Sequence, residues 1–441
     1  MMCPGCHRPI ARSAHRGPSG NACARGFTMV ELLVALTAGL FVASAAFLLA
    51  RNSSRFFQHE AAISTAQFAA MTGLGRLQAD LQRAAFLSSP NVTLDPLRIG
   101  DMTTWPIGLK VLAGVSIEKG GSVSHHLADH NSPTGLSSLN GLAPDSIVVG
   151  GSFATTEQFA ARAMFGGGGA PLQIYLQWDD GPMQRTKAAA ESGGNTLDNA
   201  LGLIFAPRRF LRIVDDEGRQ AYGQIEGFAM QDPTTPVVTV EASPRVPTDE
   251  TDGIGFSGMG IGTLVNPVYR VLYDVRVVDP AVYTQYQGLF VKGRHAVQAE
   301  HKGAPLPPRT ELVRVEHKQL GEEIETTLEV VAEYAVDLKF GLTEAEPPFT
   351  APLLRRYPLG ADPVYEAAAP LDASPAGRPQ RIRSVQVQLS TRGEVRDRDL
   401  PIPALSGGNL LRYSLGTGAG YVRVRTLVTD VALPNQAGVG W

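Results

Sequence analysis

Residues 25–36 read Arg25-Gly26-Phe27-Thr28-Met29-Val30-Glu31-Leu32-Leu33-Val34-Ala35-Leu36, and the apolar run from Phe27 continues to Ala50 as FTMVELLVALTAGLFVASAAFLLA. Glu31 is the one charged residue between Arg25 and Arg51. As a helix, residues 27–50 rise about 36 Å, which exceeds the roughly 30 Å of a bilayer's hydrocarbon core. The sequence therefore predicts a transmembrane helix over residues 27–50.

The charges on either side of this run predict its orientation. Residues 1–26 contain four arginines and no acidic residue, a charge of +4, whereas the whole 441-residue chain carries −3. Residues 27–441 therefore carry −7, which gives no reason to expect a nucleic-acid partner. The positive-inside rule keeps residues 1–26 in the cytoplasm and exports the rest. Arg51 and Arg55, on the far side, reduce this asymmetry without reversing it.

The same residues resemble the processing site of type IV pilins and type II secretion pseudopilins. In that family a basic leader ends in Gly, Phe follows, and Glu stands at the fifth mature position; Gly26, Phe27 and Glu31 match residue by residue. The resemblance implies that prepilin peptidase, an aspartic protease of the bacterial inner membrane, cleaves between Gly26 and Phe27 and then N-methylates Phe27. It further implies a single-pass inner-membrane protein with a periplasmic head, which later joins other pilin or minor pilin subunits in a pilus or pseudopilus.

The position of Glu31 has a physical interpretation. A carboxylate in hydrocarbon costs about 2.5–3.5 kcal/mol on insertion scales, so it needs a partner. Cleavage before Phe27 creates an α-amino group at the right depth to supply a positive charge. In type IV pilins and pseudopilins, which residues 25–36 resemble, the glutamate of one subunit pairs with the α-amino group of its neighbour. The resemblance implies that this pairing sets the one-turn stagger between neighbouring subunits during assembly.

Two other interpretations of the apolar run remain open. The first is a secretory signal peptide, because Ala43-Ser44-Ala45 has the A-x-A form of a cleavage site and would leave Ala46 as the first residue. Against it, the run is longer than the 7–15 residues of a usual signal-peptide core and contains Glu31. The second is an uncleaved signal anchor. A lipoprotein is excluded because Cys23 precedes the apolar run.

The helix is predicted to continue beyond Arg51 as an amphipathic segment over residues 51–88. Apolar residues recur at helical spacing, as expected for one buried face: Phe68, Met71, Leu74, Leu77, Leu81 and Ala84. Polar residues, among them Arg76 and Asp80, are assigned to the opposite side. Gly73 and Gly75 weaken the prediction, and Pro90 is the expected stop. A helix over residues 27 to 87 would be about 90 Å long.

Residues 89–441 are predicted to form a large exported head of mostly antiparallel strands, which makes the chain an α+β protein. Alternating apolar and polar residues identify half-buried strands at 271–277, 313–316, 336–340, 385–389 and 422–425, with a further candidate at 172–178. The chain contains 47 Gly and 31 Pro, consistent with many turns. Long connections are expected at 117–144, 179–198, 241–262 and 343–380.

A weaker resemblance concerns the branch of the family. Residues 77–86, Leu-Gln-Ala-Asp-Leu-Gln-Arg-Ala-Ala-Phe, are similar to the helix end of PilW-type minor pilins and of the J-type minor pseudopilin. Residues 312–338, the strand at 382–389 and the strand at 421–428 also look PilW-like. A head of this size suits a low-abundance subunit, at a filament tip or in a priming complex, better than the repeating subunit of a fibre.

The remaining candidate chemistry is sparse. Cys3, Cys6, His7 and Cys23 resemble half a zinc site, but all three cysteines lie in the leader. His126 and His130, with Asp129 near, could share a metal if helical; acidic runs at 179–180, 215–217 and 249–252 could bind Ca²⁺ but lack the spacing of an EF-hand. Residues 253–258 spell G-x-G-x-x-G outside any βαβ context, and residues 165–170 are not a P-loop. We expect no cofactor, no metal and no enzymatic activity.

Two classes of function follow. The first is a structural subunit that acts in pilus or pseudopilus initiation, and the second is an anchored exported domain with its own binding activity, such as an adhesin. The two are not exclusive, because a tip subunit could also adhere.

Overall fold

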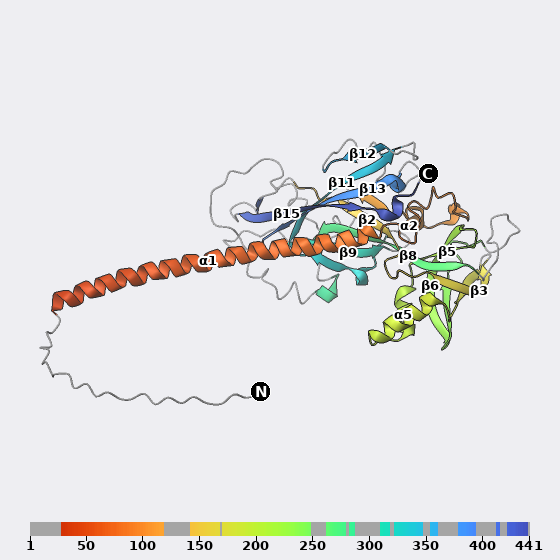
Figure 1. The fold of residues 1–441 in the computed structure, drawn as a ribbon, viewed down its shortest axis with the longest axis horizontal. Coiled ribbons are helices and arrows are strands. Elements are labelled where there is room, and N and C mark those ends of the chain that lie inside the picture. The colour runs from red at the N-terminus through yellow and green to blue at the C-terminus, as the bar shows by residue number, and fades with distance from the viewer. Residues whose placement is uncertain are drawn as a thin grey trace, which may run out of the picture. The chain divides into compact units, whose positions relative to one another are not determined.

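A computed structural model describes residues 28–118, 142–167, 170–247, 262–278, 282–286, 309–317, 322–346, 353–359, 378–393, 412–414 and 421–439. The chain divides into two compact units, Met1–Gln58 and His59–Trp441. The expected α+β class is confirmed: an apolar N-terminal helix precedes a large, mostly antiparallel β-rich region with long connections (Figure 1).

Helix α1 spans Met29–Gln82 without interruption at Gly73 or Gly75. It ends five residues before the expected boundary near residue 87. Ala85 and Leu87 have φ angles of 58° and 49°, in the left-handed region that cannot continue an α-helix. The Asn435 amide donates to the carbonyls of Gln82 (3.2 Å) and Ala84 (3.1 Å), so residues near the C-terminus of the chain satisfy the end of the helix.

The buried face of α1 differs from the expected one. Phe68 and Met71 are 71% and 53% exposed, whereas Ala66 and Ala70 are buried. The buried positions among the described residues of the helix are Ala66, Ala70, Gly73, Leu74, Leu77, Asp80 and Leu81, and Ala84 is buried just beyond its end. The prediction was wrong for the first turns because the two larger apolar residues, Phe68 and Met71, were taken to face the core. The side chains buried in these turns are the small ones of Ala66 and Ala70, and a Cβ at the next buried position, Gly73, would stand 2.8 Å from the Cβ of Ala332.

The larger sheet contains ten described strands in two parts. Its strands are β1 (Val115–Glu118), β2 (Ser146–Gly151), β3 (Phe159–Gly167), β4 (Ala170–Leu176), β5 (Phe210–Val214), β6 (Gln220–Asp232), β7 (Thr235–Val240), β8 (Leu264–Arg276), β9 (Glu311–His317) and β10 (Glu329–Ala332). Strand β8 belongs to both parts. Its first residues pair with β3 and β5, and its later residues pair with β2 and β9.

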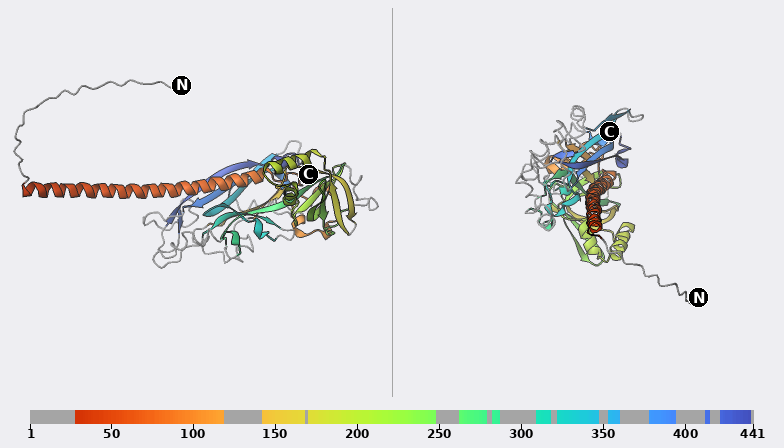
Figure 2. Two further views of the ribbon diagram at one scale, coloured as in Figure 1. Left: turned by 90° about the horizontal axis from the view of Figure 1, so that it is seen from below. Right: turned by 90° about the vertical axis from the view of Figure 1, so that its left-hand side faces the viewer.

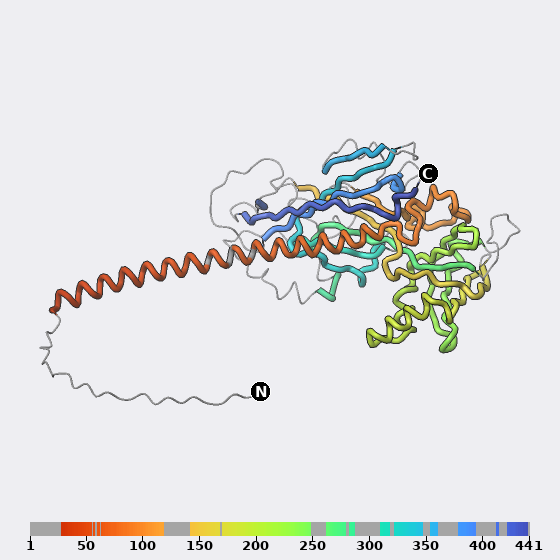
Figure 3. Tube along the Cα trace, in the orientation of Figure 1, coloured from red at the N-terminus to blue at the C-terminus, as the bar shows by residue number. Residues whose placement is uncertain are grey.

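The first part is a closed ring of antiparallel pairings. Starting from β8, the order β3, β4, β7, β6 and β5 returns to β8. Its inner residues form a separate apolar core around Phe159, Ile174 and Val238. The tube in Figure 3 shows that these yellow-green segments lie together, apart from the blue C-terminal strands. A closed ring leaves no free edge within this part of the sheet.

Two helices between β4 and β5 correct the expectation of a long irregular connection at 179–198. They are α5 (Gly181–Ser192) and α6 (Leu197–Ile204). Asp180 occupies the N-cap position of α5, with Pro182 in its first turn, and Thr196 caps α6 by accepting from the Asn199 amide at 3.3 Å. These start signals lie among Gly and Ser and were overlooked.

The second sheet has the strand order β12-β11-β13-β15-β14, all antiparallel. Its strands are β11 (Ala335–Glu346), β12 (Leu353–Tyr357), β13 (Ile382–Arg392), β14 (Arg412–Ser414) and β15 (Tyr421–Ala432). The expected strands at 336–340, 385–389 and 422–425 are confirmed, as are those at 172–178, 271–277 and 313–316 within a residue or two in the larger sheet. Strand β12 lies inside the expected irregular connection at 343–380, where four of its five residues are exposed.

The main core lies between the two sheets and includes the C-terminal half of α1. Leu74, Leu77 and Leu81 of the helix pack with residues of β8 and β9 on one side and of β11 and β13 on the other. Figure 2 shows this part of α1 running alongside the strands of both sheets. The described short helices are α2 (Ile107–Lys110), η1 (Met102–Thr104), η3 (Thr284–Tyr286), η4 (Glu325–Thr327), η5 (Pro379–Arg381) and η6 (Pro434–Gln436).

Gly73 and Gly75 make a matched pair for testing this packing. A Cβ at Gly73 would stand 2.8 Å from the Cβ of Ala332 and 3.1 Å from a methyl group of Leu389, whereas a Cβ at Gly75 would meet nothing within 4 Å. We expect Gly73→Ala to destabilise the head by about 1–3 kcal/mol through overpacking. Gly75→Ala should stabilise it by up to about 1 kcal/mol through helix propensity.

Urea unfolding of the two variants in detergent measures both values. Equal effects of the two substitutions would contradict the close approach of α1 to β10 and β13.

Candidate functional site

The first residues of α1 form a reciprocal N-terminal cap. The Glu31 carboxylate accepts from the Thr28 amide at 2.9 Å and from the Thr28 hydroxyl at 2.9 Å, while the Glu31 amide donates to that hydroxyl at 3.3 Å. This is a capping box, in which the N-cap Thr and the Glu three residues later satisfy each other's exposed groups. The Thr28-x-x-Glu31 spacing was visible in the sequence and was missed there.

The cap leaves the charge of Glu31 uncompensated. Both groups that donate to its carboxylate belong to Thr28 and are neutral. Hydrogen bonds of this kind lower the cost of placing a carboxylate near a membrane, but they do not supply the opposite charge that would neutralise it. Within the described residues of the single chain, Glu31 therefore lies ready to accept a cationic partner.

The segment that follows has the length and composition of a membrane span. Met29–Ser54 has a mean hydropathy of 2.4, and none of its most apolar window is buried inside the protein. It is the one helix in the described part of the chain that meets this criterion. Gly26 and Phe27 lie outside the described residues, so their cleavage and methylation remain predictions from the sequence.

Comparison with protein families identifies the sequence feature to which these residues belong. The model of the prokaryotic N-terminal methylation motif matches residues 21–47, which include Gly26, Phe27 and Glu31. The chain carries a prepilin-type methylation motif. Together with the apolar helix, the motif supports a type IV pilin-like protein and a substrate of prepilin peptidase. No curated protein and no solved structure matches the chain.

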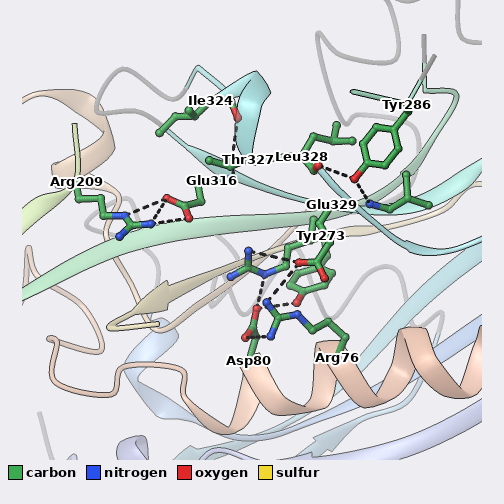
Figure 4. A network of polar contacts seen from close by, with 12 residues as sticks. Arg76, Asp80, Arg209, Tyr273, Tyr286, Glu316, Ile324, Thr327, Leu328 and Glu329 are labelled. Atoms are coloured by element: carbon green, nitrogen blue, oxygen red, sulfur yellow. Dashed lines mark hydrogen bonds and ion pairs between the residues drawn. The ribbon is translucent and has the colours of Figure 1, made fainter. Parts of the chain in front are cut away.

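A second polar site lies where the pilin-like helix α1 meets the head. Asp80 is 2% exposed, although the sequence pattern placed it on the polar side of the helix. One of its carboxylate oxygens accepts from the Arg314 guanidinium and from the Tyr273 hydroxyl, each at 2.7 Å (Figure 4). Arg76, one turn earlier, lies 3.6 Å from the other oxygen. Asp80 therefore binds α1 to strands β8 and β9.

The protonation states within this cluster follow from its burial. Burial raises the pKa of the Tyr273 hydroxyl, and the Asp80 carboxylate raises that pKa further, so Tyr273 stays protonated and donates. Burial alone would lower the pKa of the Arg314 guanidinium, but the adjacent Asp80 carboxylate outweighs it and raises the pKa. The cluster is thus a charged pair supported by a neutral phenol.

Arg83 closes the same junction just beyond the end of the helix. Its guanidinium donates to the carbonyls of Phe153 (3.1 Å), Ser152 (2.7 Å) and Thr155 (3.1 Å). The Ala85 amide donates to the Gly150 carbonyl at 2.8 Å, and the Ser152 amide to the Phe86 carbonyl at 2.9 Å. The segment after β2 is therefore held against the end of α1 by both side-chain and backbone hydrogen bonds.

The other candidates are only partly described. His126, His130, the acidic run at 249–252 and the glycines at 253–258 lie outside the described residues. Asp180 accepts from the Ala160 amide at 3.2 Å, and Asp215 accepts from the Arg219 amide and guanidinium in the turn between β5 and β6. Across the described ranges, no group of three or more His, Cys, Asp and Glu side chains could hold a metal ion.

The Asp80 cluster can be tested against a weaker pair of the same network. Removing one charge of a buried pair leaves the other uncompensated, so Asp80→Asn should destabilise the head by about 3–5 kcal/mol. Glu329 pairs with Arg76 at 3.4 Å, but its side chain is 46% exposed. Glu329→Gln should therefore cost less than about 1 kcal/mol.

Chemical denaturation of both variants distinguishes these values. A loss for Asp80→Asn no larger than that for Glu329→Gln would contradict the role assigned to the Asp80–Arg314 pair.

Proposed function

We propose that the chain is a minor type IV pilin of the PilW-like kind, present at low abundance. Its leader, residues 1–26, is removed by prepilin peptidase between Gly26 and Phe27, and Phe27 is then N-methylated. The helix anchors the subunit in the bacterial inner membrane with the head in the periplasm. The subunit then takes part in the initiation of a pilus, at or near its tip. The observation that carries this proposal is the methylation motif at residues 21–47, on an apolar helix whose one acidic residue is Glu31.

Glu31 would act in assembly through charge. In the single chain it accepts hydrogen bonds from Thr28 alone among the described residues. The α-amino group of a processed neighbouring subunit would supply the missing positive charge inside the apolar phase, where an unpaired carboxylate costs several kcal/mol. An incoming subunit would be drawn to the depth at which its amine meets this carboxylate.

The size of the head supports a low-abundance role. Residues 89–441 form a much larger head than a closely repeating fibre subunit requires, and the closed ring of β3–β8 with α5 and α6 adds to its bulk. Such a head is easiest to place where it has few neighbours, at a tip or in a priming complex. A tip subunit whose head also binds a surface would be compatible with this size.

A J-type minor pseudopilin of a type II secretion system is the second candidate, because residues 77–86 are similar to both branches. The contacts of these residues explain the shared pattern. Leu77, Leu81 and Ala84 fill the core, and Asp80 pairs with Arg314. These residues hold the helix against its own head, so a PilW-type minor pilin and a J-type pseudopilin would both need them.

Substitutions of Glu31 separate its two roles. Gln at this position still accepts the capping hydrogen bonds but carries no charge, whereas Ala removes both. We expect Glu31→Gln and Glu31→Ala both to insert in the membrane and to be at least tenfold depleted from sheared filaments or from the priming complex. Quantitative immunoblots of membrane and filament fractions measure this.

Normal assembly of Glu31→Gln, together with failure of Glu31→Ala, would show that only the cap matters. That result would overturn the proposed charge pairing.

A further inference from the structure

We propose that the outer face of the closed ring of strands binds a neutral sugar residue. The site, which we name the aromatic corner, consists of Phe165 on β3, Gln173 and Tyr175 on β4, and Gln231 on β6. The ligand class is a hexopyranose with an apolar face of C–H groups, as in β-linked galactose or glucose. The inference uses residues of the head alone and goes beyond the role in pilus initiation proposed above.

The strand register places the aromatic corner on the outside of the closed ring of strands. Ile174 lies in the apolar core inside, so its neighbours Gln173 and Tyr175 point outward. Phe165 stands directly opposite Gln173 and is 60% exposed. Gln231, on β6, is exposed as well. The four side chains therefore belong to one solvent-facing surface that crosses β3, β4, β7 and β6.

Tyr175 lies flat against this surface. It stands directly opposite Val237 of β7, and its hydroxyl accepts from Gln231 Nε2 on the next strand at 3.2 Å. Val237 is only 4% exposed, although it alternates with the core residue Val238 and so points outward. The phenol ring of Tyr175 therefore covers Val237 and turns its other face to solvent.

Phe165 stands upright beside this flat ring. The ring centroids of Phe165 and Tyr175 are 5.4 Å apart, and the two ring planes meet at 89°. The pair thus forms a floor and a wall, both open to solvent on one side. A sugar ring that stacks its C–H face on the floor and sets its edge against the wall would bury apolar surface on both aromatic rings.

The two amides complete the site with polar groups at its rim. The Tyr175 hydroxyl donates to Gln173 Oε1 at 3.3 Å and accepts from Gln231 Nε2. Within the described part of the chain, this arrangement leaves Gln173 Nε2 as an unused donor and Gln231 Oε1 as an unused acceptor. Neighbouring sugar hydroxyls both donate and accept, so they match one donor and one acceptor at the edge of a stacking surface.

Charge and topology favour a sugar over other partners. The residues that the register places beside Gln173 and Tyr175 on β7 and β6 are uncharged: Thr239, Val237, Gly227 and Ala229. The charged residues that flank them along β3 and β6 are one cation and two anions, Arg162, Glu226 and Asp232. A nucleic acid or an anionic lipid would need an excess of cations. A peptide strand would need a free sheet edge, and the described pairings close this ring of strands.

The test is saturation-transfer NMR with the full chain in phosphatidylcholine nanodiscs. The probes are lactose and cellobiose, which present β-linked galactose and glucose. We expect saturation of C–H protons on one face of a hexose ring in at least one of the two disaccharides. Mannitol, an open-chain polyol with similar hydroxyl groups but no ring face, should show none.

Matched variants test stacking and hydrogen bonding separately. Phe165→Ala and Tyr175→Ala each remove one aromatic surface and should weaken binding of the disaccharide on the order of tenfold. Tyr175→Phe keeps the floor but breaks the hydrogen bonds to both amides, so its loss should be smaller, about threefold. The control is Phe68→Ala, which removes an equally exposed Phe (71%) from α1 and should bind as the parent does.

Absence of saturation in both disaccharides for the parent chain would overturn the inference. Unchanged binding by Phe165→Ala, whose exposed side chain is not needed for folding, would also overturn it, as would saturation of mannitol equal to that of the sugars. Failure of the proposed function is seen separately, as normal assembly of Glu31→Gln in the filament fractions.

Discussion

The buried pair between Asp80 and Arg314 is the interaction on which the packing of the head depends. It lies where α1 enters the core, and both partners are buried charged groups, so they tolerate little displacement. Sliding the helix by one turn would separate the pair and would also move Gly73 away from Ala332, where no larger residue fits. Charge and close contact therefore specify one position of the helix between the two sheets.

The junction also explains how one helix serves two environments. Apart from Glu31, its first half is apolar on all sides, as expected for a segment in lipid, whereas its second half buries one narrow stripe of Ala, Gly and Leu, together with Asp80, against the sheets. Phe68 and Met71 are exposed whereas the smaller Ala66 and Ala70 are buried, so hydrophobicity alone does not identify the buried face of the helix. At the C-terminal end of the helix, hydrogen bonds from the Arg83 guanidinium to the Phe153 carbonyl and from the Asn435 amide to the Gln82 carbonyl hold the adjacent loops in place.

Local sequence patterns predicted many of the strands and the N-terminal helix, but not the ion pairs between residues far apart in the sequence. The strands at 271–277, 313–316 and 385–389 could be recognised because apolar and polar residues alternate along each. The expected burial of one face holds at 385–389, whereas β8 and β9 are buried on both faces, including their polar residues. Helix α5 and strand β12 were missed because their residues are mostly exposed and lie among Gly and Pro. The position of Asp80 was assigned wrongly because its burial depends on Arg314, 234 residues later, and no local pattern encodes that partner. The methylation motif at residues 21–47 could be recognised because it is contiguous in the sequence, and the roles of Gly26, Phe27 and Glu31 within it remain predictions.

The most direct test of a prepilin-type identity is the N-terminal peptide of the chain from cells with and without a functional prepilin peptidase, determined by mass spectrometry. The account predicts a chain that begins with N-methyl-Phe27 when the peptidase is present and retains residues 1–26 when it is absent. A chain that begins at Ala46, or one that keeps its leader in the presence of the peptidase, would contradict it.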